Sequence, residues 1–158
     1  MYFKEKQRFS QWWLWLLLLL VVSNLVREFI NGTAEEKDAL FFSALTLTLT
    51  SVLFGVMKLE TTIDSDGIAV RFFPFHFKKK HFNWDQLESC FIRTYNPIIE
   101  YGGWGIRKTF TGKGTAYNVK GKKGLQLIFN NGDRLLIGTQ KAEELKEVLL
   151  ALEQINEA

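Results

Sequence analysis

The stretch AYNVKGKKGLQLIFNNGDRLLIGT, residues 116–139, decides the fold. It contains three short runs rich in apolar residues, separated by the tetrapeptides GKKG and NNGD. Glycine and asparagine favour the tight turns that join neighbouring antiparallel strands. The stretch therefore predicts three consecutive antiparallel strands.

The same pattern extends towards the N-terminus, where the turn DSDG (64–67) separates two further runs that alternate between apolar and polar residues. It predicts four more strands, near Leu59–Ile63, Ile68–Phe73, Lys79–Trp84 and Leu87–Thr94. A long stretch, Tyr95–Thr115, connects them to the first three, and loops of that length tend to be functional or disordered. Short strands with regular turns predict an antiparallel all-β domain.

The C-terminal sequence KAEELKEVLLALEQINE predicts a helix that packs on this domain. Its apolar residues recur at helical spacing, and Glu143 and Glu144 fall in the first turn, where the helix dipole favours acidic side chains. The residues of that apolar stripe are Leu145, Val148, Leu149, Leu152 and Ile155.

The motif YGGWGIR, residues 101–107, and the stretch 116–145 together resemble the bacterial membrane-anchored members of the pleckstrin-homology-like family. In such proteins a Gly-Gly-Trp-Gly-Ile-Arg stretch precedes the fifth strand, and an Ile-Gly-Thr stretch, here residues 137–139, leads into the last helix. The resemblance implies a barrel of about seven antiparallel strands with a C-terminal α-helix over residues 59–158. It implies no enzymatic activity and no cofactor. The acidic loop 64–67 departs from the basic loop of relatives that bind phosphoinositides, so binding of that kind is disfavoured.

Two apolar runs precede this domain, Trp12–Val26 and Ala39–Leu59. Because a spanning helix needs about 20 apolar residues, they predict a two-helix transmembrane hairpin, with helices at about 12–30 and 39–58 and a short external loop at 31–38. Residues 1–58 would then form an N-terminal cytoplasmic stub and the hairpin. The rival interpretation of the first run is a cleaved signal peptide, but no small-residue cleavage site follows it.

Basic residues flank the hairpin, and positively charged flanks stay in the cytoplasm. They are Lys4, Lys6, Arg8 and Lys58. The sequence thus predicts a multi-pass protein of the bacterial inner membrane with both termini cytoplasmic. Small residues in the second helix (Ala44, Thr48, Ser51 and Gly55) form a stripe that predicts close helix packing within the hairpin, with a homo-oligomer contact as the alternative.

Nothing in the chain forms a recognisable catalytic, cofactor or metal motif. The segment around Gly112-Lys113 fails the Walker A pattern at both ends, and GGWG is not a dinucleotide-binding fingerprint. His76, His81 and Cys90 lack the further ligands that a metal site needs. We therefore expect a protein that is not an enzyme and holds no cofactor.

Basic residues are concentrated in residues 71–134, and the strand order predicts that several gather at the membrane-proximal end of the barrel. The predicted surface comprises Lys78, Lys79, Lys80, Trp104, Arg107, Lys108 and Lys113. Cations beside large apolar groups suit an anionic lipid leaflet. Trp104 would be packed or interfacial, and Arg107 would face a lipid phosphate or a carboxylate of the domain.

We therefore expect a binding or scaffold module, anchored in the lipid bilayer, that contacts anionic lipid headgroups or a protein partner. The alternative is an accessory or assembly subunit of a larger membrane protein complex, with the hairpin as the main contact. Nucleic acid is not an expected partner, because no groove-reading helix or aromatic RNA-binding strand is evident.

Overall fold

The computed structural model describes residues 1–158 except 11, 32–33, 110–111 and 155–158, and leaves the side chains of 13, 14 and 34–39 undescribed. The chain divides into two units. One comprises Met1–Arg8 and Lys58–Ala158, and the other is the helical hairpin Phe9–Met57. Residues 1–8, expected to be a stub, thus belong to the same unit as the C-terminal domain.

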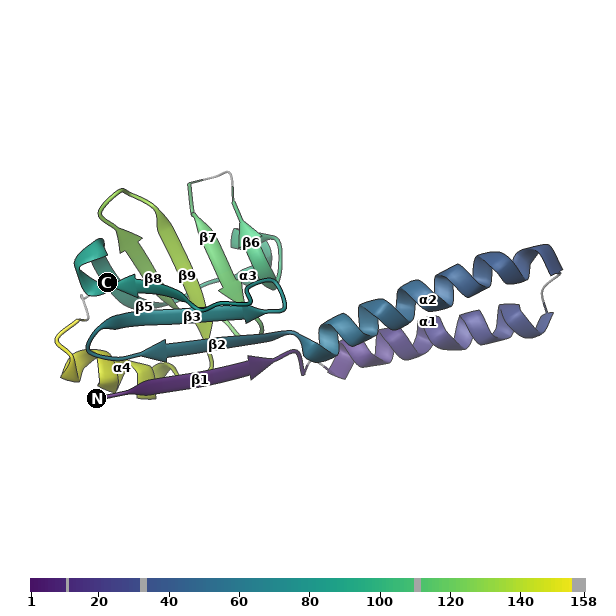
Figure 1. Cartoon of the computed structure of the whole chain (residues 1–158), viewed down its shortest axis with the longest axis horizontal. Coiled ribbons are helices and arrows are strands. Elements are labelled where there is room, and N and C mark those ends of the chain that lie inside the picture. The colour runs from purple at the N-terminus through teal and green to yellow at the C-terminus, as the bar shows by residue number, and fades with distance from the viewer. Residues whose placement is uncertain (11, 32–33, 110–111, 155–158) are drawn as a thin grey trace. The chain divides into compact units, whose positions relative to one another are not determined.

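Sheet A has four antiparallel strands in the order β1-β2-β3-β4 (Figure 1). They are β1 (Phe3–Arg8), β2 (Lys58–Ile63), β3 (Gly67–Phe73) and β4 (Lys80–Asn83). In β1 buried and exposed residues alternate strictly, as they do in a strand with one face on a core. The two chain segments that flank the hairpin therefore meet as neighbouring strands.

Sheet B has five strands in the order β5-β8-β9-β7-β6. They are β5 (Leu87–Thr94), β6 (Gly105–Lys108), β7 (Thr115–Asn118), β8 (Lys123–Phe129) and β9 (Arg134–Thr139). The short helix η1 (Trp84–Gln86) precedes β5. The pair β7–β9 is parallel, while the other pairs are antiparallel.

The core lies between the two sheets and the C-terminal helix. Aromatic rings meet across the sheets: the centroids of Phe72 in β3 and Tyr117 in β7 are 6.5 Å apart. Helix α4 (Ala142–Ala151) buries Leu145 and Leu149 almost completely. The predicted C-terminal helix is therefore present; Ile155 of the predicted stripe lies outside the described residues.

The long stretch after β5 is ordered where it is described. Asn96 caps the one-turn helix α3 (Pro97–Tyr101), because its side chain accepts hydrogen bonds from the N–H groups of Ile98 and Ile99 at 3.1 Å. Gly102 ends this helix in the left-handed conformation, with φ of 71°. Strand β6 then carries the rest of the YGGWGIR motif to the edge of sheet B.

The predicted closed barrel of about seven antiparallel strands is wrong. The described residues form nine strands in two separate sheets. One pair of neighbouring strands, β7 and β9, is parallel. The error has two sources. The N-terminal residues add β1 to sheet A, and β7 pairs with β6 and, in the parallel direction, with β9 instead of with β8, the strand that follows it in the chain.

The hairpin consists of α1 (Trp12–Asn31) and α2 (Ala34–Val56). In its second half α1 carries Ser23, Asn24 and the ion pair Arg27–Glu28, with Nη2 and Oε1 3.4 Å apart. Helix α2 begins with the charged sequence AEEKD. These polar residues shorten the apolar stretch of each helix below the roughly 20 residues that a span needs.

In the parts of α1 and α2 that the structure describes, no helical stretch is both long enough and apolar enough to cross a membrane. This finding overturns the predicted transmembrane hairpin. It equally overturns the prediction of a multi-pass protein of the bacterial inner membrane with two cytoplasmic termini.

Candidate functional site

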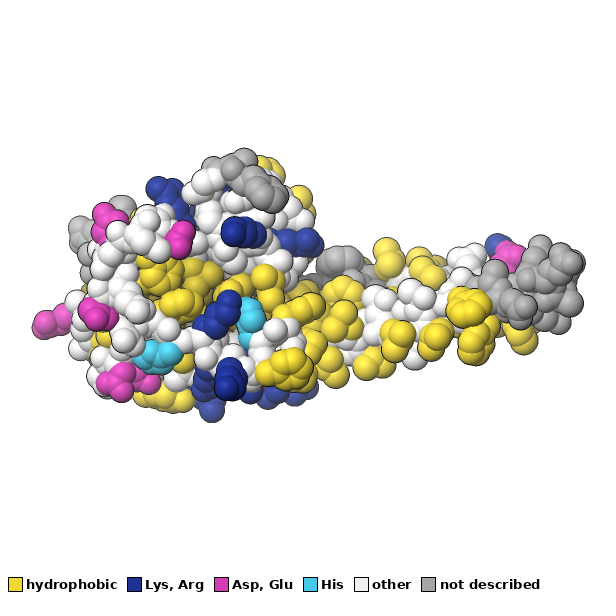
Figure 2. Space-filling model, turned by 45° about the horizontal axis from the view of Figure 1, so that its top comes forward, with side chains coloured by type: hydrophobic (Ala, Val, Ile, Leu, Met, Phe, Trp, Pro, Cys, Tyr) yellow, Lys and Arg dark blue, Asp and Glu magenta, His cyan; other side chains and the backbone are white. Residues whose placement is uncertain are grey.

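The outward face of sheet A is strongly basic. Strand alternation directs Lys4, Lys6 and Arg8 of β1 to this face, and the register places Lys58 opposite Arg8. Six cations share the face: Lys4, Lys6, Arg8, Lys58, Arg71 and Lys79. We call these six residues the basic face. Figure 2 shows Lys and Arg side chains gathered along the lower edge of the domain.

The structure describes every residue of strands β1–β4. Within these strands, Glu60 is the one acidic residue whose side chain points to the basic face. It pairs with Lys6 at 3.8 Å and Lys58 at 3.4 Å, and it accepts a hydrogen bond from Arg71 Nε at 3.0 Å. Burial raises the pKa of Glu60, but the hydrogen bond and charge of Arg71, together with Lys58, outweigh it and hold the pKa below its ordinary value. The carboxylate therefore stays ionised, and it balances only part of the positive charge around it.

Aromatic rings adjoin one end of the basic face. Phe73 lies opposite Lys58 in the register, and Lys58 Nζ is 5.2 Å from its ring centroid. The ring of Phe77 is edge-on to Phe73 at 6.2 Å and is 78% exposed. This end of sheet A thus combines cations with a large apolar side chain open to the surroundings.

The predicted lysine triplet does not act as one group. Lys79 Nζ reaches Thr62 Oγ1, at 3.5 Å, and so belongs to the basic face. Lys80 pairs with Val70, whose side chain is buried, and its Nζ donates to Tyr117 Oη of sheet B at 3.0 Å. Lys78 is exposed in the loop before β4.

The other predicted site residues lie on sheet B. Arg107 and Lys108 are exposed on β6, and Arg107 Nε donates to the backbone oxygen of Trp104 at 3.2 Å. Trp104 is half-buried, and its indole nitrogen is enclosed. Lys113 lies 4.0 Å from Glu100, in a hollow described below.

The glycines of YGGWGIR serve structure. Gly102 and Gly103 have φ of 71° and 124°, which close α3 and turn the chain. The N–H group of Gly105 donates to the buried Asn118 Oδ1 at 2.9 Å and so fixes the start of β6 beside β7. The motif therefore builds a helix end and a strand start.

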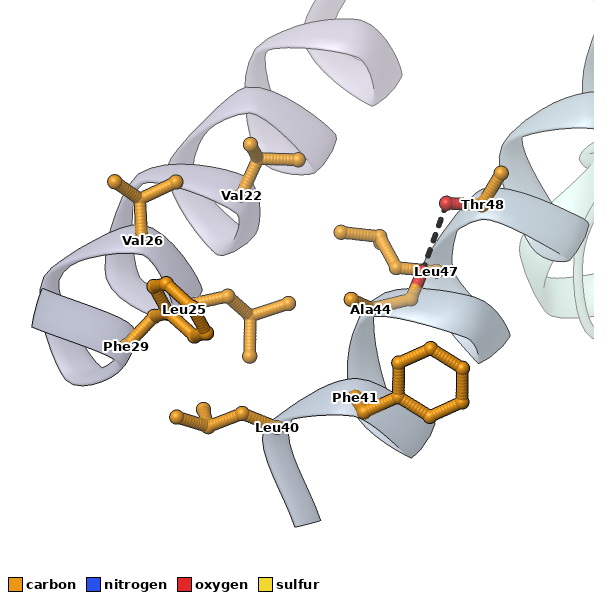
Figure 3. A pocket seen from close by; sticks show the side chains of 9 residues that line it. All are labelled: Val22, Leu25, Val26, Phe29, Leu40, Phe41, Ala44, Leu47 and Thr48. Carbon is orange, nitrogen blue, oxygen red and sulfur yellow. Dashed lines mark hydrogen bonds between the residues drawn. The ribbon is translucent and has the colours of Figure 1, made fainter. Parts of the chain in front are cut away.

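The hairpin has an apolar groove of about 360 Å³ between its helices (Figure 3). Leu25 of α1 and Leu40, Ala44 and Leu47 of α2 point into this gap. Large apolar side chains also lie exposed along both helices, with Leu19 67% and Phe41 65% exposed. Helices that are apolar on most sides are usually covered by other apolar groups.

The predicted stripe of small residues on α2 is only partly used within the hairpin. Ala44 and Thr48 line the groove beside α1. The hydroxyls of Thr48 and Ser51 donate to backbone oxygens of their own helix, each at 2.8 Å. A Cβ added at Gly55 would meet no described atom within 4 Å, so Gly55 is not a point of close helix approach.

Among the described residues no group of three or more His, Cys, Asp or Glu side chains forms a metal site. His81 Nδ1 lies 2.9 Å from Asn83 Oδ1. The pKa of His76 is lowered by burial and by the charge of Lys80, so this ring is neutral at pH 7. Burial raises the pKa of the Cys90 thiol to about 12, which removes its nucleophilic character at neutral pH.

Sequence reasoning missed β1 and therefore half of the basic face. The signal was present, because the basic residues in FKEKQR recur at every second position, as on one face of a strand. Their position before an apolar run favours a membrane flank instead. No family model matches this chain, and no curated protein or solved structure was found to match it.

Proposed function

We propose that this protein is a non-enzymatic binding module that contacts the anionic headgroups of a lipid surface through the basic face of sheet A. One observation carries the proposal: six cations share one sheet face with a single carboxylate, and the exposed ring of Phe77 adjoins them. Cations near an anionic leaflet contribute about 1 kcal/mol each. An adjoining aromatic side chain suits the boundary between headgroups and acyl chains.

The arrangement of charge supports a functional role. Arg8 and Lys58 lie directly opposite each other in the β1–β2 ladder, where like charges destabilise a sheet. Glu60 offsets part of this repulsion from the next row. An anionic surface would relieve the remaining repulsion between these cations. A role in binding such a surface therefore accounts for a face on which Glu60 balances only part of the positive charge.

Lipid headgroups fit this face better than nucleic acid does. Among the described residues, the basic face has a phenyl ring only at the end of β3, Phe73, with Phe77 beside it, whereas RNA-binding sheets stack two or three bases on rings spread over the sheet. The face is also four strands wide, whereas a DNA major groove admits an α-helix or a two-stranded β-ribbon.

The test is co-sedimentation of the full chain with vesicles of phosphatidylcholine alone or mixed with phosphatidylglycerol. The exposed apolar side chains of the hairpin adsorb equally to both, so the ratio of the two affinities isolates the charge effect. We expect the anionic vesicles to bind more tightly. The triple variant Lys6→Gln, Arg8→Gln, Lys79→Gln should lose that preference on the order of a hundredfold.

A matched control carries the same change in net charge elsewhere: Lys120→Gln, Lys122→Gln, Lys146→Gln, at three exposed positions. It should keep most of the preference for anionic vesicles. The proposal is wrong if neutral and anionic vesicles bind equally, or if both triple variants lose the same amount.

The hairpin favours a second candidate function, as an accessory or assembly subunit of a protein complex. Its exposed apolar side chains and the groove between α1 and α2 suit packing against apolar helices of a partner protein. Mild purification of the native protein, followed by light scattering, tests this. Stoichiometric co-purification of another protein supports it, and a monodisperse monomer with no bound protein contradicts it. The resemblance to pleckstrin-homology-like proteins stays a prediction.

A further inference from the structure

A second basic feature lies on sheet B, apart from the basic face of sheet A. It is a hollow of about 220 Å³. Its lining comes from β5, β8 and β9 together with α3 and the segment before β7. The lining residues are Phe91, Arg93, Glu100, Lys113, Gln126, Ile128 and Arg134.

Arg93 is held rigidly at this hollow. Its Nε donates to Gln126 Oε1 at 3.0 Å, and its two terminal nitrogens donate to Glu100 Oε2 at 2.9 Å and Tyr101 Oη at 3.1 Å. A guanidinium has five N–H groups, so these bonds leave two for another acceptor. The side chain is thus oriented in advance, which lowers the entropic cost of binding.

Glu100 is fully engaged by the protein itself. Its Oε1 accepts from the Asn96 N–H group at 2.7 Å, and its Oε2 accepts from Arg93. Burial raises its pKa, but the backbone hydrogen bond from Asn96 and the bond and charge of Arg93 outweigh it, so the pKa lies below its ordinary value. The ionised carboxylate therefore balances one of the three cations in the lining.

Lys113 and Arg134 supply the charge that Glu100 does not balance. Lys113 Nζ is 4.0 Å from Glu100 Oε2, the outer limit for an ion pair, and its side chain is 46% exposed. Arg134 is exposed at the start of β9. The backbone at Gly114 abuts Arg134 so closely that a Cβ there would collide with the Arg134 backbone oxygen. This contact holds together the backbone segments that carry Lys113 and Arg134, and both side chains line the hollow.

We propose that this hollow binds a compact oxyanion bearing two negative charges, such as a phosphate group. Arg93 supplies the fixed donors, and Lys113 and Arg134 close over the anion from the more exposed side. Guanidinium and ammonium groups together match a phosphate both in geometry and in charge. The inference is independent of the lipid contact proposed for sheet A.

Calorimetric titration of the full chain with inorganic phosphate, at constant ionic strength and pH 7.5, tests the site. We expect saturable binding at one site per chain, weakened at least tenfold by Lys113→Gln and by Arg134→Gln. Both positions are exposed, so the variants should fold. Lys122→Gln, at an exposed position outside the hollow, should bind phosphate as the wild type does. An absence of saturable heat, or equal affinity in all four proteins, overturns the proposal.

A vesicle arm separates two sources of the anion. If the site takes a lipid phosphate, Arg134→Gln should also weaken binding to vesicles that contain phosphatidic acid. If it takes a free phosphate compound, the vesicle affinity of Arg134→Gln should equal that of Lys122→Gln while phosphate binding is still lost. Both results presuppose that the titration shows phosphate binding. Because that titration tests the hollow and the phosphatidylglycerol experiment tests the basic face, either proposal can be refuted without the other.

Discussion

Glu5 of β1 accepts a hydrogen bond from Thr139 of β9, with Oε2 and Oγ1 2.6 Å apart, so that a buried carboxylate joins the two sheets. Its Oε1 accepts from the Gln140 N–H group at 2.9 Å, and Gln7 Nε2 donates to the Gly138 oxygen at 2.7 Å. Both β1 side chains thus bond the end of β9, just before α4 begins. The N-terminal strand is therefore part of the domain's framework.

Removing this carboxylate should destabilise the domain. Glu5→Ala leaves the buried Thr139 hydroxyl and the partly buried Gln140 N–H group without their acceptor, which costs about 2 kcal/mol of unfolding free energy. Chemical denaturation followed by tryptophan fluorescence measures the change. Lys4→Ala, at the adjacent exposed position of β1, is the control and should change the unfolding free energy by less than about 0.5 kcal/mol. Equal effects of the two substitutions would mean that β1 is not docked as described.

Two glycines in one loop separate backbone strain from steric clash. Gly112 and Gly114 both have left-handed φ, 76° and 81°. A Cβ at Gly112 meets no described atom within 4 Å, whereas one at Gly114 would collide with the Arg134 backbone. Gly112→Ala should therefore cost about 1 kcal/mol, and Gly114→Ala at least about 2 kcal/mol more. Thermal unfolding of both variants checks this, and a difference near zero would refute the close approach of β7 to β9.

Sequence patterns predicted local structure well where the strands pair with their neighbours in the chain. The alternation in Ile68–Phe73 and the run LQLIF correspond to β3 and β8, and the periodicity of Leu145 and Leu149 corresponds to α4. These elements satisfy their backbone groups and apolar faces through short-range turns or a single buried stripe. Propensity and periodicity carry that information directly.

Long-range pairing could not be predicted in the same way. Strand β1 finds its partner β2 across the whole hairpin, and β7 lies parallel to β9 after an intervening strand. In neither pair are the two strands joined directly by a short turn, so no turn motif in the sequence predicts the pairing. The candidate site depends on register as well: neighbouring residues of a strand point to opposite faces, so Lys79 and Lys80 separated although they are adjacent in sequence.

Cys90 should resist alkylation in the folded protein. Burial raises its pKa to about 12, against an ordinary value of 9.0, so the thiolate at pH 8 is about a thousandfold rarer than for an exposed thiol. Iodoacetamide labelling, read by mass spectrometry, should be slow in buffer and rapid in 6 M guanidinium. Rapid labelling in buffer would contradict the prediction, because it would show that the Cys90 thiol is accessible to the reagent in the folded protein.

Glu60 predicts a pH dependence of stability. Its folded-state pKa lies below the ordinary value of 4.5, so its stabilising contribution is present above about pH 4.5 and is lost as the pH falls through the folded pKa. Glu60→Gln should therefore lower the unfolding free energy at pH 7, and the difference from the wild type should shrink below pH 4.5. Urea denaturation of both proteins between pH 3 and pH 7 measures it. If the difference in unfolding free energy between Glu60→Gln and the wild type stays constant from pH 3 to pH 7, the charge of Glu60 is not its cause, and the prediction is wrong.

The same substitution should strengthen lipid binding if the basic face is the contact surface. Glu60→Gln removes the carboxylate shared by Lys6, Lys58 and Arg71, so one further positive charge faces the headgroups. At about 1 kcal/mol per charge, affinity for vesicles containing phosphatidylglycerol should rise about fivefold, and affinity for phosphatidylcholine should not change. Glu143→Gln makes the same change in net charge on α4 and is the control. Because a solvated basic surface without a lipid role predicts equal gains for both variants, a larger gain for Glu60→Gln singles out the face of sheet A.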